Sequence, residues 1–515
     1  MPTTAPPAPP APPPPGPPPP PPPGPPPWAP PPPPPPAAGP VRPPLPPAPL
    51  PVLGRALAAG LLAATLVPDH RLGVGTVVTA LGIAAAAPPG ARLRTPFGAA
   101  FGAVAVGLVL VAVLRDAAWL LSLCVLGAAA SWSLLLSGAD GWVAVVRGAV
   151  AIPLRWWPAA PWLARAVPAL LAAERRSALL PVLRGAGVAA ALLVVFGALF
   201  ATADAAFGEL LGRLVPPAPG DTLVARTAVA LAVAVLVGAA VRVASAPPTT
   251  SARAPYAGRV LRPVEWVLPL VLLDLLFAAF VAVQLTVLFG GRAHVLATSD
   301  LTYAEHAREG FGQLVAAAVL TLGVIAVASR LAPSTPGSRR LRQVLLGVLC
   351  LLTLVVLASA SRRLGLYEQQ YGFTRLRLSV DGAIGWLAVV LLLVLGALTR
   401  PRAVWLPRAL ALSAAVGLLV FALADPDARI AERNVERFVL TGDLDGQYLA
   451  ELSADAVPAL DRLPEPQRSC VLGERSAVTA DSRIEANLSR ARAGEALRER
   501  PIRSCPPGTL VGAYR

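Results

Sequence analysis

One long apolar run, from Val264 to Phe289, carries the polar side chains Asp274 and Gln284 at membrane depth. Asp274 stands near the middle of this run and Gln284 nearer its end. If the run crosses a membrane, a carboxylate at that depth costs about 3 kcal/mol, so it is expected to face other helices, pair or bind something. Asp274 is therefore a candidate proton or cation site. The alternative is a protonated or hydrogen-bonded Asp274 that joins two helices.

Pro269 precedes Asp274 by about one helical turn and leaves a backbone carbonyl without its helical donor. Interrupted helices are where transporters coordinate ions, so this proline strengthens the first interpretation. Gln284 is about 80° from Asp274 around an ideal helix. The two side chains therefore need not share one site, although both are candidates for binding an ion or substrate.

A second group of candidates lies in the segment TSDLTYAEHAREGFGQLV. Thr302 and Glu305 form a capping box, and Glu305 can also pair with Arg308. Helix capping therefore explains part of the pattern without any function. Tyr303 and His306 are not explained by capping and remain candidates for an external polar site.

The segment LYEQQYGFTRLRLSVDG adds Tyr371, Arg375 and Arg377 to this group. The two arginines alternate with apolar residues, so in an extended segment they would point the same way. Together with Arg308 they would suit a phosphate or carboxylate, because guanidinium groups bind both in a bidentate manner. The alternative is that they pair with acids of the chain itself. Those acids are Glu305, Glu368 and Asp381.

The sequence offers no enzyme signature. It contains no Walker A loop, GxSxG elbow, HExxH pair or GxGxxG turn. Four Cys and three His show no metal-ligand spacing, and Cys124 and Cys350 lie in apolar runs as small buried side chains. We therefore expect no metal and no cofactor, and an enzyme is the less favoured interpretation.

The elements that would position these residues are membrane-spanning helices. The chain is 55% hydrophobic and 14% charged, whereas soluble proteins have about 25% charged residues. Its apolar runs are about 20 residues long, the length that crosses a bilayer. We count eleven spans, at 53–68, 72–88, 97–114, 117–136, 184–203, 223–244, 264–289, 310–331, 342–361, 382–399 and 404–424. The predicted fold is an all-α polytopic bundle.

The net charge of +15 comes from arginines placed between the apolar runs and not on one basic face. It therefore argues for membrane topology and against a nucleic-acid partner. With the N-terminus inside, the inner loops hold about twice the arginine of the outer loops, as the positive-inside rule expects. The composition is typical of GC-rich codons. We expect a bacterial inner-membrane protein with a cytoplasmic N-terminus and an extracytoplasmic C-terminus.

Outside the predicted bundle of residues 52–424 the chain has two distinct ends. Residues 1–51 hold more than half of the 61 prolines and predict a disordered, polyproline II-like tail. This tail is either a spacer or a docking tract for a protein partner such as an SH3-like module. Within the bundle, the Trp- and Arg-rich segment from Trp142 to Trp162 is expected to lie along the membrane surface.

Residues 425–515 are polar and only marginally able to form a core. If they lie outside the cell, Cys470 and Cys505 can form a disulfide. Such a bond would stabilise the segment by about 4 kcal/mol on the loop-entropy model.

Several stretches together resemble a known family. They are Asp274 with VAVQLTVLFGG, TYAEHAREGF, LYEQQYGFTRLR, and NVERF with LDGQYLAELSADAVPAL. This combination resembles the bacterial membrane proteins called domain of unknown function 4153 or 4173, over roughly residues 184–460. The resemblance implies a membrane protein and, because that family has no assigned activity, no mechanism.

Three hypotheses for function follow. The first is a transporter or channel-like protein that uses Asp274. The second is an envelope scaffold or signalling protein that acts through its tails. The third and least favoured is an enzyme on an anionic lipid-linked substrate at the outer face, acting through the external polar group.

Overall fold

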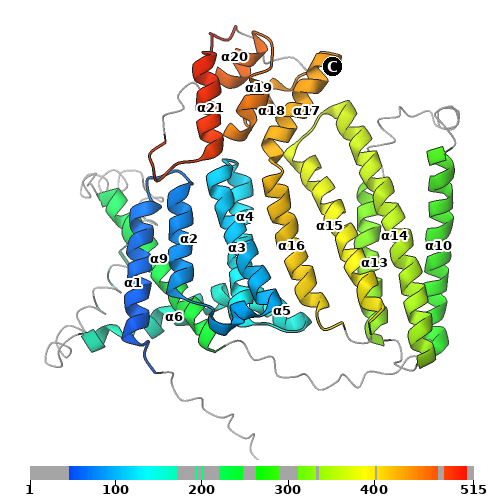
Figure 1. Cartoon of the computed structure of the whole chain (residues 1–515), viewed down its shortest axis with the longest axis horizontal. Helices are drawn as coiled ribbons and strands as arrows, with labels where there is room; N and C mark the ends of the chain where they lie inside the picture. Colours follow the sequence, from blue (N-terminus) through cyan, green and yellow to red (C-terminus); the bar gives the residue numbers. More distant parts are fainter. Residues whose placement is uncertain are drawn as a thin grey trace, which may run out of the picture. The chain divides into compact units, whose positions relative to one another are not determined.

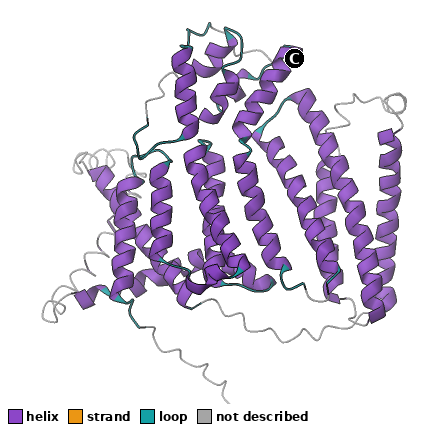
Figure 2. Cartoon of the chain, in the orientation of Figure 1, coloured by secondary structure: helices purple, strands orange, loops and turns teal. Residues whose placement is uncertain are grey.

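The computed structural model of the chain describes residues 46–170, 220–246, 262–289, 311–331, 336–400, 403–473 and 481–506, with a few single positions between 185 and 204. The chain divides into two units, Met1–Pro46 and Pro47–Arg515, and the architecture below is that of the second. The proline-rich tail lies outside the described residues apart from its last few positions. Every regular element in the described part is a helix (Figure 2). The prediction of an all-α fold is confirmed.

Eight described helices are long and apolar enough to cross a membrane. They are α3 (Pro96–Leu114), α4 (Ala118–Ser137), α9 (Gly220–Ser245), α10 (Pro263–Phe289), α13 (Phe311–Leu331), α14 (Pro336–Tyr371), α15 (Arg375–Leu398) and α16 (Leu406–Leu423). Each coincides with a predicted span. The chain is thus a bundle of membrane-spanning helices, as its composition predicts.

The predicted total of eleven spans is not confirmed. Two predicted spans correspond to α1 (Leu50–Leu66) and α2 (Val74–Ala86), which are 17 and 13 residues long. At 1.5 Å per residue α2 is only about 20 Å long, shorter than a hydrocarbon layer of about 30 Å. The predicted span at 184–203 lies outside the described residues, except for single positions.

The segment around Arg375 differs from its prediction. Helix α14 continues to Tyr371, so the stretch predicted as the start of an external loop is helical. Helix α15 then begins at Arg375, and the side chain of Thr374 accepts a hydrogen bond from Arg377 N at 3.4 Å. The segment that carries Arg375 and Arg377 is therefore helical and not extended, because Thr374 is a good N-cap residue and the apolar periodicity of α15 starts directly after it.

Contacts between loops define two ends of the bundle. At the end where α1 begins, Ala48 N donates to Trp162 O, and Arg408 Nε donates to Ala139 O at 2.7 Å. Two short helices, α5 (Trp142–Ala149) and α6 (Ala151–Ala164), lie at this N-terminal end (Figure 1). Trp157 of α6 is 88% exposed. That this segment lies along the membrane surface stays a prediction.

Two large apolar cores hold the bundle together. One is shared by α10, α13, α14 and α15, with Leu270, Ile325 and Leu391 among its buried members. Another joins α3 and α4 to α16 through Leu108 and Leu121. Because α15 and α16 also contact each other, the two cores form neighbouring parts of one bundle.

The opposite end carries a group of short helices, here called the C-terminal subdomain. It comprises α17 (Pro426–Thr441), α18 (Gly446–Ala450), η3 (Ala454–Ala456), α19 (Val457–Leu460), α20 (Gln467–Leu472) and α21 (Leu488–Glu499) (Figure 1). Its own core includes Ile430, Leu449 and Leu460, all fully buried. Asp425 begins α17, and its side chain accepts a hydrogen bond from Ala428 N at 3.3 Å.

Candidate functional site

Asp274 lies on the face of α10 that packs into the bundle. Trp266 and Leu270, on the same face, are 5% and 3% exposed and belong to the core shared with α13, α14 and α15. Asp274 itself is 8% exposed, and neither of its carboxylate oxygens has a hydrogen-bond partner among the described residues. A buried polar group without a partner costs about 1–3 kcal/mol, and an unpaired charge costs more. This carboxyl group is therefore suited to hold a proton or a cation.

Helix α10 is continuous through Pro269. The expectation of an interrupted helix beside Asp274 is wrong for this segment. Pro269 deprives only the carbonyl of Glu265 of its helical donor, and Glu265 lies in the first turn of α10. The break therefore falls near the helix end, and Asp274 projects from regular helix.

Gln284 makes a separate polar contact, ten residues further along α10. Its Oε1 accepts hydrogen bonds from Ser359 Oγ at 3.2 Å and from Arg363 Nη2 at 3.1 Å, both on α14. At 1.5 Å per residue this contact lies about 15 Å along the helix axis from Asp274. The structure thus places Asp274 and Gln284 at different depths. Arg363, predicted in an external loop, instead joins two membrane-spanning helices.

Two further acids lie between α14 and α15, nearer the end that carries the C-terminal subdomain. Asp381 Oδ1 accepts a hydrogen bond from Ser361 Oγ at 3.0 Å. Glu368 is 6% exposed, and its Oε1 has no hydrogen-bond partner in the described part of the chain. Ser361 and Glu368 are seven residues apart and so share one face of α14. Polar groups therefore continue from mid-bundle at Asp274 toward the subdomain end.

Arg375 is fully engaged by the C-terminal subdomain. Its Nε and Nη2 donate to the two oxygens of Asp427, at 2.9 and 2.6 Å, and its backbone N donates to Tyr448 Oη at 2.7 Å. The guanidinium also lies 5.9 Å from the Trp119 ring centre. Asp427 is fully buried. The partner acid is none of the three expected from sequence, and this arginine is not available for an external anion.

Arg377 is held within its own segment. Its Nη1 donates to Tyr371 O at 2.9 Å, and its guanidinium lies 4.4 Å from the Tyr367 ring centre. Tyr371 is 46% exposed. Arg375 and Arg377 thus have different partners and do not form one anion site. The remaining predicted members of the external polar group lie outside the described residues; they are Tyr303, Glu305, His306 and Arg308.

The C-terminal subdomain supplies hydrogen bonds that the ends of α3 and α4 lack. Asn487 Nδ2 donates to Ala112 O at 3.0 Å and to Arg115 O at 2.8 Å, at the last turn of α3. Asp455 Oδ2 accepts from Asp116 N at 2.8 Å and from Ala117 N at 3.0 Å, at the start of α4. Helix ends leave such groups unpaired, so these contacts both cap the two helices and dock the subdomain.

Buried ion pairs reinforce this contact. Arg490 is 6% exposed and bonds Asp116 Oδ1 at 2.6 Å and both oxygens of Asp481 at 2.9 Å. Arg115 pairs with Asp425. Burial, aided by Asp455, nevertheless raises the pKa of Asp425 to about 6, and Arg115 only partly opposes this.

Asp427 behaves in the opposite way to Asp425. Burial acts to raise its pKa, but hydrogen bonds from Arg375 and from Ser453 outweigh burial and lower it below its usual value. Asp427 therefore stays ionised at neutral pH, as a bidentate partner of Arg375 requires.

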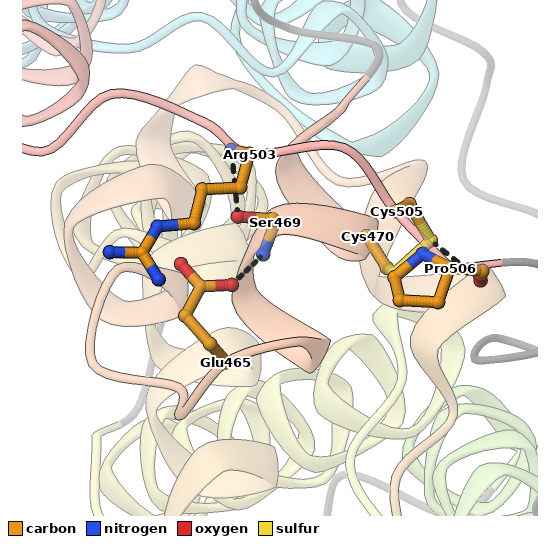
Figure 3. The surroundings of a disulfide bond; sticks show 6 residues. All are labelled: Glu465, Ser469, Cys470, Arg503, Cys505 and Pro506. Atoms are coloured by element: carbon orange, nitrogen blue, oxygen red, sulfur yellow. Dashed lines mark hydrogen bonds between the residues drawn. A yellow bond between two sulfur atoms is a disulfide. The ribbon is translucent and has the colours of Figure 1, made fainter.

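A disulfide joins Cys470 of α20 to Cys505 (Figure 3). Beside it, Ser469 Oγ accepts from Arg503 N at 3.0 Å, and Ser469 N donates to Glu465 at 3.2 Å. Arg468, 1% exposed, pairs with Asp461 and Glu465. The bond and these contacts hold the segment after α21 against α20.

Sequence reasoning missed the docking residues of the subdomain. Asp116, Asp455, Asn487 and Arg490 each read as ordinary polar loop or helix-end residues. One signal was present: only three residues separate α3 from α4, and Ala117 at the N-cap of α4 offers no side-chain acceptor. The partners, more than 300 residues away in sequence, cannot be found from that signal.

The fold defines a multi-pass α-helical membrane protein, with a helical subdomain docked on one end and a buried acid that has no partner in the described part of the bundle. The chain belongs to the family described as Domain of unknown function (DUF4153), whose profile matches residues 102–463. This confirms the resemblance drawn from the sequence and extends it toward the N-terminus, from residue 184 to residue 102. No curated protein and no solved structure matches the chain. Among the described residues, no group of three or more His, Cys, Asp or Glu side chains could hold a metal ion.

Proposed function

We propose that the protein moves protons across the membrane, alone or coupled to a substrate, and that Asp274 is the group that binds and releases the proton. The observation that carries this proposal is the environment of Asp274: a buried carboxyl group in the middle of a membrane-spanning helix, with no hydrogen-bond partner for either oxygen among the described residues. Acids in membrane-spanning segments are costly and commonly mark proton or ion pathways.

A proton suits this environment better than a metal cation. Small metal cations need several oxygen ligands around them. The buried hydroxyls of Thr321 on α13 and Thr353 on α14 instead donate to carbonyls of their own helices, Ala317 O at 2.8 Å and Leu349 O at 2.6 Å. A single carboxyl group suffices for a proton.

The acids between α14 and α15 would provide further groups along a proton route from Asp274 to one end of the bundle. Asp381 bonds Ser361 at the same level of α14 as the contact of Gln284 with Arg363, and Glu368 lies further toward the subdomain end. If the positive-inside pattern sets the orientation, this end faces outward. The route would then run from the external face to mid-bundle.

The test is proton uptake into vesicles that contain the purified full-length chain and a pH-sensitive dye, with valinomycin and K⁺ holding the membrane potential at zero. Wild type should take up protons faster than empty vesicles. Asp274→Asn should reduce uptake to the empty-vesicle rate, whereas Asp274→Glu should retain part of it. Glu265→Gln, an exposed acid on the same helix, is the matched control.

Two results would refute the proposal. One is equal uptake by Asp274→Asn and Glu265→Gln. The other is a wild-type chain that does not conduct protons and whose infrared difference spectrum, compared with that of Asp274→Asn, shows no additional titrating carboxyl group.

The scaffold hypothesis makes a different demand. If the tails carry the function, deletion of residues 1–46, which leaves α1 and Ala48 intact, should change the phenotype of cells that depend on the protein, and Asp274→Asn should not. This comparison separates the two functions without knowledge of the substrate.

A further inference from the structure

A large cavity opens between α4, α15 and α16, in the half of the bundle nearest the C-terminal subdomain. Its volume is about 620 Å³. The walls are mainly apolar and aromatic, and include Trp119, Leu123, Trp386, Val389, Leu418 and Phe421. A cavity of this size and lining is typical of sites for apolar or amphiphilic ligands.

The depth of the cavity matches one leaflet of a bilayer. The cavity extends from Ser413 to Ala424 along α16 and from Leu378 to Val389 along α15. At 1.5 Å per residue each of these stretches spans about 16 Å. Half of a hydrocarbon layer is about 15 Å thick. An acyl chain of one leaflet therefore fits along the cavity.

The cavity is also open to the side. Leu123, Val389 and Val420, which line it, are 44%, 43% and 60% exposed. A methyl group added at Gly385 would meet no atom within 4 Å, so the backbone of α15 borders open space there. A ligand can thus enter from the surrounding bilayer.

A positively charged side chain lies at the end of the cavity nearest the C-terminal subdomain. Arg429 of α17 lines the cavity and has no carboxylate partner among the described residues. Arg433 and Arg437 of the same helix are paired, with Glu436 and Asp443. The other charged lining residue, Asp381, accepts the hydrogen bond from Ser361.

We propose that this cavity binds a glycerophospholipid of the bilayer, with one acyl chain along α15 and α16 and the phosphate at Arg429. Arginine binds phosphate through two parallel hydrogen bonds, and a site at the membrane surface places the guanidinium at headgroup level. The proposal depends on the membrane-spanning bundle and is independent of the role of Asp274.

The test measures which lipids stay with the purified full-length protein. Delipidated protein in detergent is mixed with phosphatidylglycerol or with diacylglycerol of the same acyl chains, purified again, and its lipid is quantified by mass spectrometry. Wild type should retain phosphatidylglycerol in preference to diacylglycerol. Equal retention of the two by wild type would overturn the proposed phosphate contact.

Two pairs of variants locate the site. Gly385→Leu fills the cavity and should lose both lipids, whereas Gly396→Leu, at another open and exposed position of α15, should behave as wild type. Arg429→Gln should remove the preference for phosphatidylglycerol, and Arg433→Gln should keep it. Matching behaviour within either pair would contradict the proposed position of the lipid.

A second measurement needs no variant. Phosphatidylglycerol with a photoreactive acyl chain, reconstituted with the wild-type protein, should label α15 and α16 at cavity residues such as Val389 and Val416. Labelling spread evenly over all exposed apolar faces would show only surrounding lipid and would overturn the proposal.

Discussion

Replacement of Arg375 by Met should increase local opening of the C-terminal subdomain far more than replacement of an exposed arginine does. The substitution keeps a long apolar side chain but removes both hydrogen bonds to Asp427, at 2.9 and 2.6 Å. Asp427 is fully buried and, in the wild type, ionised; it keeps its contacts to Trp119 Nε1 at 3.2 Å and Ser453 N at 2.9 Å. Loss of one partner from a buried ion pair costs about 3–5 kcal/mol.

This free-energy cost converts into a change in the equilibrium constant for local opening of the subdomain. Each 1.4 kcal/mol changes an equilibrium tenfold, so opening of the subdomain should become more frequent by roughly two to four orders of magnitude. Hydrogen exchange of the buried backbone amides of α17, followed at pH 7 in detergent, measures this equilibrium directly. In the wild type pH 7 lies above the lowered pKa of Asp427, so its carboxylate is charged; without Arg375, burial acts to raise that pKa.

The control is Arg433→Met on the same subdomain. Arg433 pairs with Glu436 at 3.2 Å, but both side chains are more than half exposed, so the expected loss is at most about 1 kcal/mol. The double variant Arg375→Met with Asp427→Asn should lose less than Arg375→Met alone, because no buried charge remains. Equal exchange in Arg375→Met and Arg433→Met, or no recovery in the double variant, would refute the reasoning.

Three further predictions concern the two ends of the chain. Burial raises the pKa of Asp425 to about 6 in the folded state, above the value of about 3.9 in an unfolded chain, so folding favours its protonated form. The docked subdomain should therefore be more stable at pH 5 than at pH 7.5 in thermal melts. Asp425→Asn should remove that difference. Cys470 and Cys505 should react with a membrane-impermeant thiol reagent in intact cells only after reduction; labelling only after lysis would place the subdomain in the cytoplasm. Deletion of residues 1–46 should leave the melting temperature unchanged, because the chain divides at that point, and a lowered value would show that the tail packs on the bundle.

Much of the bundle could be predicted from local composition alone. The eight long helices coincide with apolar runs because burial in lipid depends on the hydrophobicity of about 20 consecutive residues, which is a local property. Asp274 also stood out on its own, since an acid inside such a run needs an explanation whatever surrounds it. The short helices α1 and α2 show the limit of this reasoning, because a run of apolar residues does not set where a helix ends.

The interaction partners of the arginines could not be predicted from local composition. Arg375 and Arg377 are two residues apart and of the same type, yet one binds a buried acid of the C-terminal subdomain and the other packs on Tyr367 of the preceding helix. Arg363 was assigned to a loop because its charge ended the apolar run, whereas the structure pairs it with Gln284 of another helix. Such pairings depend on which surfaces meet in space.

The sequence by itself therefore determined the membrane class, the helical fold, the family and the position of an acid, Asp274, inside an apolar run, because each follows from composition or a short contiguous pattern. Only the tertiary structure decided that Asp274 has no partner in the described bundle, and that Asp455 and Asn487 complete the ends of α3 and α4. It also decided that Arg429, which has no carboxylate partner in the described part of the chain, lies beside an apolar cavity. Whether a polar atom is satisfied depends on groups brought to within about 3 Å of it from distant parts of the chain, and no local pattern encodes that distance.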